Sequence, residues 1–197
     1  MPDSCLLYYI TDRRQFPGDG AQRHGALLAK IAEAVRAGVD CIQLREKDLS
    51  TSELEALATE VLRQVEQIRT EDRELRTVFL INSRTDIALA AGADGVHLRS
   101  DDISPEDVRR IWSESGGAST RERAIIAVSC HTRGEVDRAE SDGADFAVFA
   151  PVFEKKGAAP AGVDALREAG FVDIGEPLLQ ERAVQVNGKQ LLPIGVG

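Results

Sequence analysis

A four-residue phrase recurs three times in the chain, at intervals of roughly 50 residues. The copies are Ala37-Gly38-Val39-Asp40, Ala91-Gly92-Ala93-Asp94 and Asp142-Gly143-Ala144-Asp145. The glycine in second place can adopt the left-handed backbone conformation that ends many helices. The run that follows each copy is mostly apolar, as expected for a strand buried on both faces of a parallel sheet. Each copy therefore predicts a helix that ends and passes into a parallel strand.

The spacing of the phrase indicates a barrel. One strand–helix unit takes about 30 residues in a barrel that uses about 250 residues for eight units, so the phrase marks every second strand. Apolar, β-branched and aromatic runs predict seven strands, at residues 6–10, 41–44, 78–81, 96–98, 124–128, 146–149 and 191–196. Amphipathic helical stretches separate these runs. The alternation predicts an α/β fold of the TIM-type (β/α)8 barrel class.

Seven predicted strands are one fewer than such a barrel contains. We expect residues 1–197 to form a single domain whose eighth strand–helix unit is missing from this chain. Either the barrel is C-terminally incomplete or another chain closes it, which leaves a homo-oligomer open. An incomplete chain is favoured, because an open sheet edge promotes aggregation. Residues 170–190 are predicted to be an irregular insertion before strand seven, in the form of a helix, a hairpin or a loop.

Composition limits the classes of partner. The chain is 43% hydrophobic, enough for one core, and its 24 basic against 33 acidic residues argue against general nucleic-acid binding. No apolar run approaches the ~20 residues of a membrane helix, and the first residues do not resemble a secretion signal, so we expect no membrane association. The three cysteines lack metal-ligand spacing, which favours a reducing cytoplasm.

The end of the second predicted strand carries cationic and amide side chains. In a barrel of this class, chemistry is located at the carboxyl ends of the strands. Alternation places Gln43 and Arg45 on the same, inward side, while the apolar residues between them face the helices. Arg45 offers a planar fork of donors and Lys47 a point charge, a pair suited to phosphate oxygens. The alternative is that Arg45 forms an ion pair with a neighbouring acidic residue in solvent.

Polar residues also follow strands three and four. Asn82 could offer its amide to a ligand or cap the next helix. Asp102 could hold a hard cation such as Mg²⁺, with phosphates completing its shell, or belong to a helix start. His97 lies within a strand, where a hydrogen-bonded structural role is the favoured interpretation.

The later strand ends complete the candidate site. Ser129 and His131 follow strand five, and an imidazole there can move protons near neutral pH, although capping or a structural role is the alternative. After strand six, Lys155 and Lys156 could close over an anion or be ordinary surface lysines. After strand seven, Gly195 and Gly197 expose backbone amides that suit an oxyanion.

Taken together, these strand ends resemble the thiamine phosphate synthase/TenI family of phosphate-handling barrels. The resemblance covers residues 6 to about 169 and residues 191–197. Its specific blocks are Ile10-Thr11-Asp12, Gln43-Leu44-Arg45-Glu46-Lys47, Ile81-Asn82, Gly92-Ala93-Asp94-Gly95-Val96-His97-Leu98 and Val128-Ser129-Cys130-His131-Thr132. It implies a barrel enzyme of thiamine biosynthesis that handles a thiazole phosphate.

In the synthase branch, the resemblance implies that a pyrimidine diphosphate held with Mg²⁺ loses pyrophosphate. The nitrogen of the thiazole phosphate then attacks the resulting methylene cation. By motif position, the residues that hold the diphosphate and its metal would be Gln43, Arg45, Lys47, Asn82 and Asp102. Ser129 would lie against the pyrimidine or the pyrophosphate.

The chain departs from the synthase pattern at three places, and two of these departures, the lost carboxylate and the shortened loop, favour the other branch. Ser83 stands where the synthase has a second metal-binding aspartate, and Arg99-Ser100 replaces Gly-Gln. The Pro-Thr-x-Thr-Lys loop is reduced to residues 153–156. TenI-like members, which resemble this chain in lacking the second aspartate and the Thr-x-Thr segment, are thiazole tautomerases. They shift a proton on a carboxythiazole phosphate without a cofactor, using the histidine that matches His131. We therefore favour the tautomerase, with the synthase as the alternative and a non-catalytic binding paralogue as the third hypothesis.

Overall fold

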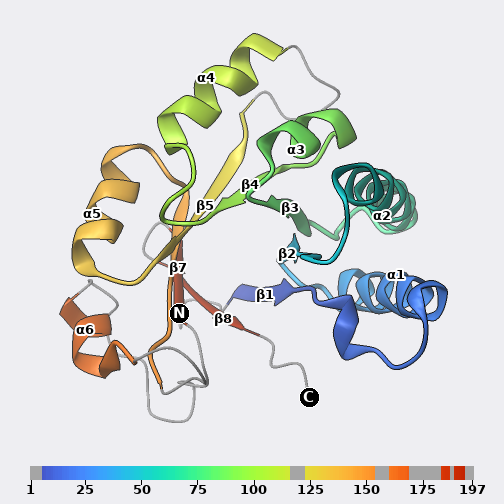
Figure 1. The fold of residues 1–197 in the computed structure, drawn as a ribbon, viewed down its shortest axis with the longest axis horizontal. Helices are drawn as coiled ribbons and strands as arrows, with labels where there is room; N and C mark the ends of the chain where they lie inside the picture. The colour runs from blue at the N-terminus through green and yellow to red at the C-terminus, as the bar shows by residue number, and fades with distance from the viewer. Residues whose placement is uncertain (1–5, 116–122, 154–159, 169–182, 187–188, 194–197) are drawn as a thin grey trace.

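Six parallel strands alternate with helices and curl around a common axis, with the helices on the outside (Figure 1). This computed structural model describes residues 6–115, 123–153, 160–168, 183–186 and 189–193. The parallel strands are β1 (Leu6–Ile10), β2 (Cys41–Leu44), β3 (Val78–Asn82), β4 (Gly95–Leu98), β5 (Ile125–Cys130) and β6 (Phe146–Phe149). The helices are α1 (Gly20–Arg36), α2 (Thr51–Glu71), α3 (Thr85–Ala91), α4 (Pro105–Ser115), α5 (Arg133–Ser141) and α6 (Gly162–Glu168), with a short 3-10 turn, η1 (Arg13–Gln15).

Two further strands close the ring. β7 (Ala183–Val186) pairs antiparallel with β6, and β8 (Lys189–Pro193) pairs antiparallel with β7 and parallel with β1. The described residues thus form six strand–helix units followed by an antiparallel pair of strands. They do not show the eight strand–helix units of the expected (β/α)8 barrel. Residues 187–188 alone separate β7 from β8, too few for the crossover of a dozen or more residues that a parallel strand needs.

This closure changes the expected order of the strands. The strand expected seventh, at residues 191–196, begins at Lys189 and takes the eighth place. Part of the segment 170–190, for which a hairpin was one of the expected forms, is strand β7, which pairs antiparallel with β8. The remainder of that segment, apart from residues 189–190, lies outside the described residues. So do Gly195 and Gly197, and the expectation of a missing eighth strand–helix unit stays a prediction.

The structure explains both the glycine and the aspartate of the recurring phrase. Its glycines take left-handed backbone angles, with φ of +78°, +78° and +82° at Gly38, Gly92 and Gly143. Its aspartates each accept a hydrogen bond from a backbone N–H of the preceding strand. The pairs are Asp40 with Leu7, Asp94 with Phe79 and Asp145 with Ile126, at 2.7, 2.8 and 2.8 Å. The phrase therefore ends a helix and ties the incoming strand to its neighbour.

Apolar side chains fill both sides of the sheet. The larger cluster lies between the strands and the helices, and it includes Ile42 and Leu44 of β2 as the alternation predicted. The smaller cluster fills the barrel interior and comprises Tyr8, Cys41, Leu80, Ala127, Phe146 and Val148. Two residues further along β2, β3 and β5, the inward positions change from apolar to polar. The interior core therefore ends below a polar layer at the carboxyl ends of these strands.

No helix in the part of the chain that the structure describes is long and apolar enough to cross a membrane.

Candidate active site at the carboxyl ends of the strands

Six polar side chains from β1 to β5 and the residue after β3 form one hydrogen-bonded chain across the barrel mouth. We call this set the mouth network. From one end to the other its members are Ser129, His97, Tyr8, Gln43, Asn82 and Ser83. The successive heavy-atom distances are 2.8, 2.6, 3.1, 2.6 and 3.1 Å. The structure thus brings together Gln43, Asn82 and Ser129, three of the predicted site residues.

The hydrogen bonds of the mouth network fit a single direction. The Tyr8 hydroxyl donates to Gln43 Oε1, so His97 donates from Nδ1 to Tyr8, and its other ring nitrogen, Nε2, pairs with the Ser129 hydroxyl. The amide of Gln43 donates to Asn82 Oδ1, and that of Asn82 donates to Ser83. His97 is 3% exposed and Gln43 2% exposed. Because buried polar groups with satisfied hydrogen bonds are held rigidly, the network fixes the side chains at the mouth.

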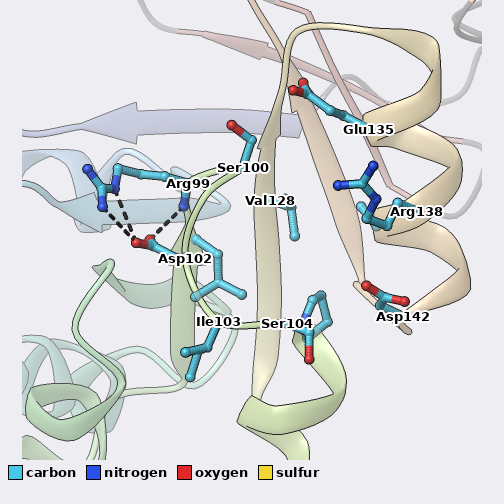
Figure 2. Close-up of a pocket in the computed structure, with 12 residues that line it drawn as sticks. Arg99, Ser100, Asp102, Ile103, Ser104, Val128, Glu135, Arg138 and Asp142 are labelled. Atoms are coloured by element: carbon cyan, nitrogen blue, oxygen red, sulfur yellow. Dashed lines mark hydrogen bonds and ion pairs between the residues drawn. The ribbon is translucent and has the colours of Figure 1, made fainter.

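Asp102 extends the network and is held by Arg99. Ser83, at one end of the mouth network, lies near enough to help lower the pKa of the Asp102 carboxyl. Asp102 Oδ2 accepts from the Arg99 backbone N–H at 2.8 Å, and Oδ1 accepts from Arg99 Nε and Nη2 at 3.2 and 3.0 Å (Figure 2). Burial by itself would raise the pKa of Asp102, but the hydrogen bonds from Arg99 and Ser83 outweigh it and lower that pKa. The carboxylate therefore stays ionised, with both oxygens engaged.

The same pairing recurs around the rim of the barrel. The loops and helix starts after β1, β2, β3 and β4 each carry an aspartate bound by an arginine, and we call these the rim pairs. They are Arg14–Asp12, Arg13–Asp48, Arg84–Asp86 and Arg99–Asp102, at N···O distances of 3.0, 2.9, 2.6 and 3.0 Å. Hydrogen bonds from the arginines lower the pKa of Asp12, Asp48 and Asp86.

The rim pairs bear on the Mg²⁺ that the family resemblance implies. Mg²⁺ at a phosphate site is held by one or two free carboxylates together with phosphate oxygens. Within the described ranges, no three acidic, histidine or cysteine side chains gather where they could hold a metal ion. The one predicted metal ligand, Asp102, already binds a guanidinium. These residues do not fit a resident Mg²⁺.

Glu46 fixes the loops that present Arg45. Its Oε1 accepts from the Thr11 hydroxyl at 2.5 Å and its Oε2 from the Arg13 backbone N–H at 2.7 Å. The Thr11 oxygen in turn accepts from the Arg45 backbone N–H at 3.0 Å. Asp48, the other acidic neighbour, is bound by Arg13. Arg45 is half-buried beyond the end of β2, and its charge helps to lower the pKa of Asp12.

Burial raises the pKa of Glu46, although its hydrogen bonds from Thr11 and Arg13 oppose the shift. The folded protein therefore holds the Glu46 proton more tightly than the unfolded chain does. The resulting stabilisation is complete below about pH 4 and is lost as pH rises through the raised pKa.

Glu46→Gln, which keeps a neutral side chain at every pH, should gain stability relative to the unmodified protein between pH 4 and pH 7. Urea unfolding across this range measures the difference, with Glu55→Gln on the exposed face of α2 as the control. A difference that moves the other way would contradict the buried environment of Glu46.

His131 lies outside the mouth network. Its side chain is 52% exposed, and Nδ1 is 3.3 Å from Glu135 Oε2. The same oxygen accepts the His131 backbone N–H, while Thr132 and Glu135 form the capping box that starts α5. Of the two residues predicted after β5 as catalytic, Ser129 is therefore in the network and His131 is at the exposed rim. His97 has both ring nitrogens hydrogen-bonded, in keeping with the structural role favoured for it.

The remaining predicted residues divide between the described and the undescribed parts of the chain. Lys47 is exposed just after β2. Asn82 does not cap α3, because Arg84 occupies the cap position of that helix. Lys155 and Lys156 lie outside the described residues. Sequence reasoning missed Tyr8 and Ser83. Alternation along β1 could have placed Tyr8 inward, but an aromatic residue in a strand is more often part of the apolar core.

A small cavity adjoins Asp102 on the side of α5. It measures about 140 Å³ and lies between the β4–α4 loop and α5, next to Ile103, Glu135 and Arg138 (Figure 2). Sites for small organic ligands usually enclose about 300–1,000 Å³. This cavity is therefore too small to be the substrate pocket, and the mouth network remains the candidate site.

The fold and the mouth network define an α/β barrel whose polar side chains gather at the carboxyl ends of parallel strands, where barrel enzymes bind their substrates. A family model described as thiamine monophosphate synthase matches residues 7–170. The chain belongs to this family.

Relatives and a solved structure agree with that assignment. The chain is 42% identical over 164 residues to a putative thiamine-phosphate synthase of Geobacter sulfurreducens, covering 81% of this chain and 67% of the relative. It is 35% identical to the putative thiamine-phosphate synthase 2 of Aquifex aeolicus, covering 82% and 76%. The thiamine phosphate pyrophosphorylase of Pyrococcus furiosus superimposes with a TM-score of 0.63 at 29% identity, covering 86% of this chain and 71% of that one. These names support the synthase, and the tautomerase favoured by the sequence departures gains no specific support.

Proposed function

We propose that this protein is a thiamine-phosphate synthase, which joins a hydroxymethylpyrimidine diphosphate to a thiazole phosphate and releases pyrophosphate. The observation that carries the proposal is the mouth network. Gln43, Asn82 and Ser129, the residues expected at the diphosphate and the pyrimidine, are joined in one rigid chain, whereas His131 stands apart from it. The 42% identical relative, a putative synthase, supports the same reading.

In this proposal the reaction breaks the C–O bond between the pyrimidine methylene carbon and the diphosphate. The electron pair leaves on the diphosphate oxygen, and the lone pair of the thiazole nitrogen forms the new C–N bond, which leaves a positively charged thiazolium. Arg45 and Lys47 stabilise the negative charge that grows on the departing pyrophosphate. Asn82 orients the diphosphate, buried Gln43 holds the Asn82 amide in place, and Ser129 lies against the pyrimidine. Pre-set donors of this kind need no rearrangement while the bond breaks.

A thiazole tautomerase is the second candidate. It is favoured by Ser83 in place of an aspartate and by the engagement of Asp102 with Arg99. A tautomerase needs phosphate binding and one proton shuttle but no metal. The histidine at the exposed rim, His131, would then be the acid–base group.

The substitution His131→Asn separates the two candidates. In a synthase, we expect the rate of thiamine phosphate formation to fall less than tenfold, because His131 lies outside the mouth network. In a tautomerase, proton exchange on the thiazole would fall by the ~10²–10⁴ that a positioned acid–base group contributes. Chromatography of the thiamine product and NMR of deuterium uptake measure the two reactions.

The matched control is His24→Asn. His24 also pairs with a glutamate, Glu60 at 2.8 Å, but it belongs to α1 on the outside of the barrel. Its substitution should leave both reactions unchanged. Exchange on the thiazole that requires His131, without formation of thiamine phosphate, would overturn the synthase proposal. Binding of both substrates without either reaction would select the non-catalytic paralogue.

A further inference from the structure

We infer that the Arg99 guanidinium, held in place by Asp102, takes the position of a metal ion at the mouth and binds the diphosphate of the substrate directly. Binding of the anion then requires no Mg²⁺. This inference rests on the proposed synthase function and specifies how that site recognises its anionic group.

The geometry around Asp102 shows a cation already in place. Arg99 approaches the carboxylate from two directions, through its backbone N–H and through the Nε and Nη2 edge of the guanidinium. Asp102 is 11% exposed, and its carboxylate is held by Arg99 through both oxygens. A divalent cation on the same carboxylate would meet the positive charge of Arg99 within a few ångströms.

The free edge of the guanidinium is available to an anion. Arg99 is 59% exposed, and its Nη1 has no partner among the residues that the structure describes. Figure 2 shows the guanidinium on the side of Asp102 away from Glu135 and Arg138 of α5. Asp101 also lies 3.4 Å from Arg99 Nε, but it is 72% exposed, where an ion pair contributes little. Arginine held by one carboxylate can still bind a phosphate through its remaining donors.

The net charge of the site links this arrangement to Ser83 and Arg99, two departures from the synthase pattern. Replacing the second aspartate by Ser83 removes one negative charge from the site. Replacing glycine by Arg99 adds one positive charge at the neighbouring strand end. Together the two changes raise the local charge by the two units that Mg²⁺ would bring. The mouth therefore keeps the same charge toward a diphosphate without the ion.

Calorimetric titration with inorganic pyrophosphate tests the inference without relying on turnover. In excess EDTA, the unmodified protein should bind pyrophosphate. Arg99→Gln should weaken this binding at least about tenfold, the loss expected for a charge-assisted hydrogen bond. The matched control is Arg110→Gln on α4. Arg110 is also 59% exposed and also lies 3.0 Å from an aspartate, Asp107, but not at the mouth, so its substitution should leave the affinity unchanged.

A second variant reverses the arrangement. Ser83→Asp combined with Arg99→Gly restores the two features of the synthase pattern, so its pyrophosphate binding should be lost in EDTA and return with Mg²⁺. Thermal unfolding shows whether each variant is folded. Pyrophosphate binding by the unmodified protein only with Mg²⁺, or undiminished binding by Arg99→Gln in EDTA, would overturn the inference.

Assays of thiamine phosphate formation keep this inference separate from the proposed function. Formation that requires Mg²⁺ and tolerates Arg99→Gln would remove the role of Arg99 and leave the synthase. Metal-free pyrophosphate binding that depends on Arg99, without any formation of thiamine phosphate, would retain the anion site and remove the synthase.

Discussion

Replacement of Gly95 by alanine should destabilise the barrel by about 3 kcal/mol or more, because an added Cβ has no room between β4 and β5. That atom would lie 1.8 Å from the carbonyl oxygen of Ile125 and 2.7 Å from its carbonyl carbon and nitrogen. All three contacts are with backbone atoms of the adjacent strand, which cannot rotate away as a side chain would. Relief would require β4 and β5 to separate where Gly95 pairs with Ile125. Urea unfolding followed by circular dichroism measures the effect.

Gly25→Ala is the matched control for this substitution. Gly25 lies within α1, and nothing lies within 4 Å of the position of its Cβ. An alanine there should stabilise the protein by about 0.5–1 kcal/mol, because alanine loses less backbone freedom than glycine in a helix. A Gly95→Ala protein as stable as the unmodified one would show that β4 and β5 are further apart than described.

Arg45→Ala should weaken the binding of inorganic phosphate and of phosphate esters by about 10²-fold, the loss of roughly two charge-assisted hydrogen bonds. The backbone of Arg45 is tied to Thr11 and, through it, to the buried Glu46, so the loop stays in place when the side chain is removed. The loss should therefore concern the anion and not the fold. Calorimetry gives the affinities, and thermal unfolding checks the fold.

Arg36→Ala controls for the loss of a positive charge. Arg36 is exposed in the last turn of α1, at the end of the helix that leads into β2, and therefore lies opposite the barrel mouth. Its removal should leave phosphate binding unchanged. Equal affinities of the Arg45→Ala and unmodified proteins would assign Arg45 a structural role only.

The six parallel strands could be predicted because their signals are local. A left-handed glycine followed by an aspartate and an apolar run defines where a helix ends and a strand begins, and each end of the observed parallel strands lies within two residues of the predicted end. The alternation of inward and outward residues is equally local, so Gln43 was correctly placed inside the barrel. These properties depend on neighbouring residues and on the period of a strand.

The antiparallel pairing of β7 and β8 was not assigned, although a strand near residue 191 and a hairpin before it were among the expectations and the sequence holds a signal for this pairing. Asn187-Gly188 is the two-residue type that often joins antiparallel strands. The regular period of the preceding strands favoured another parallel unit instead. Whether a short strand pairs with β6 or with β1 depends on how far the sheet has already curled, and no local pattern encodes that curvature.

The sequence by itself determined the family, the six strand–helix units and the set of polar residues at the strand ends. Only the tertiary structure decided which of these residues meet. The Tyr8 hydroxyl reaches His97, 89 positions away in the chain, and Gln43 reaches Asn82, 39 positions away. It also decided that Asp102 binds Arg99 and that His131 stays at the rim. The physical reason is that alternation gives the direction of each side chain, whereas hydrogen bonds require distances across the mouth, and these depend on the closure of the whole sheet.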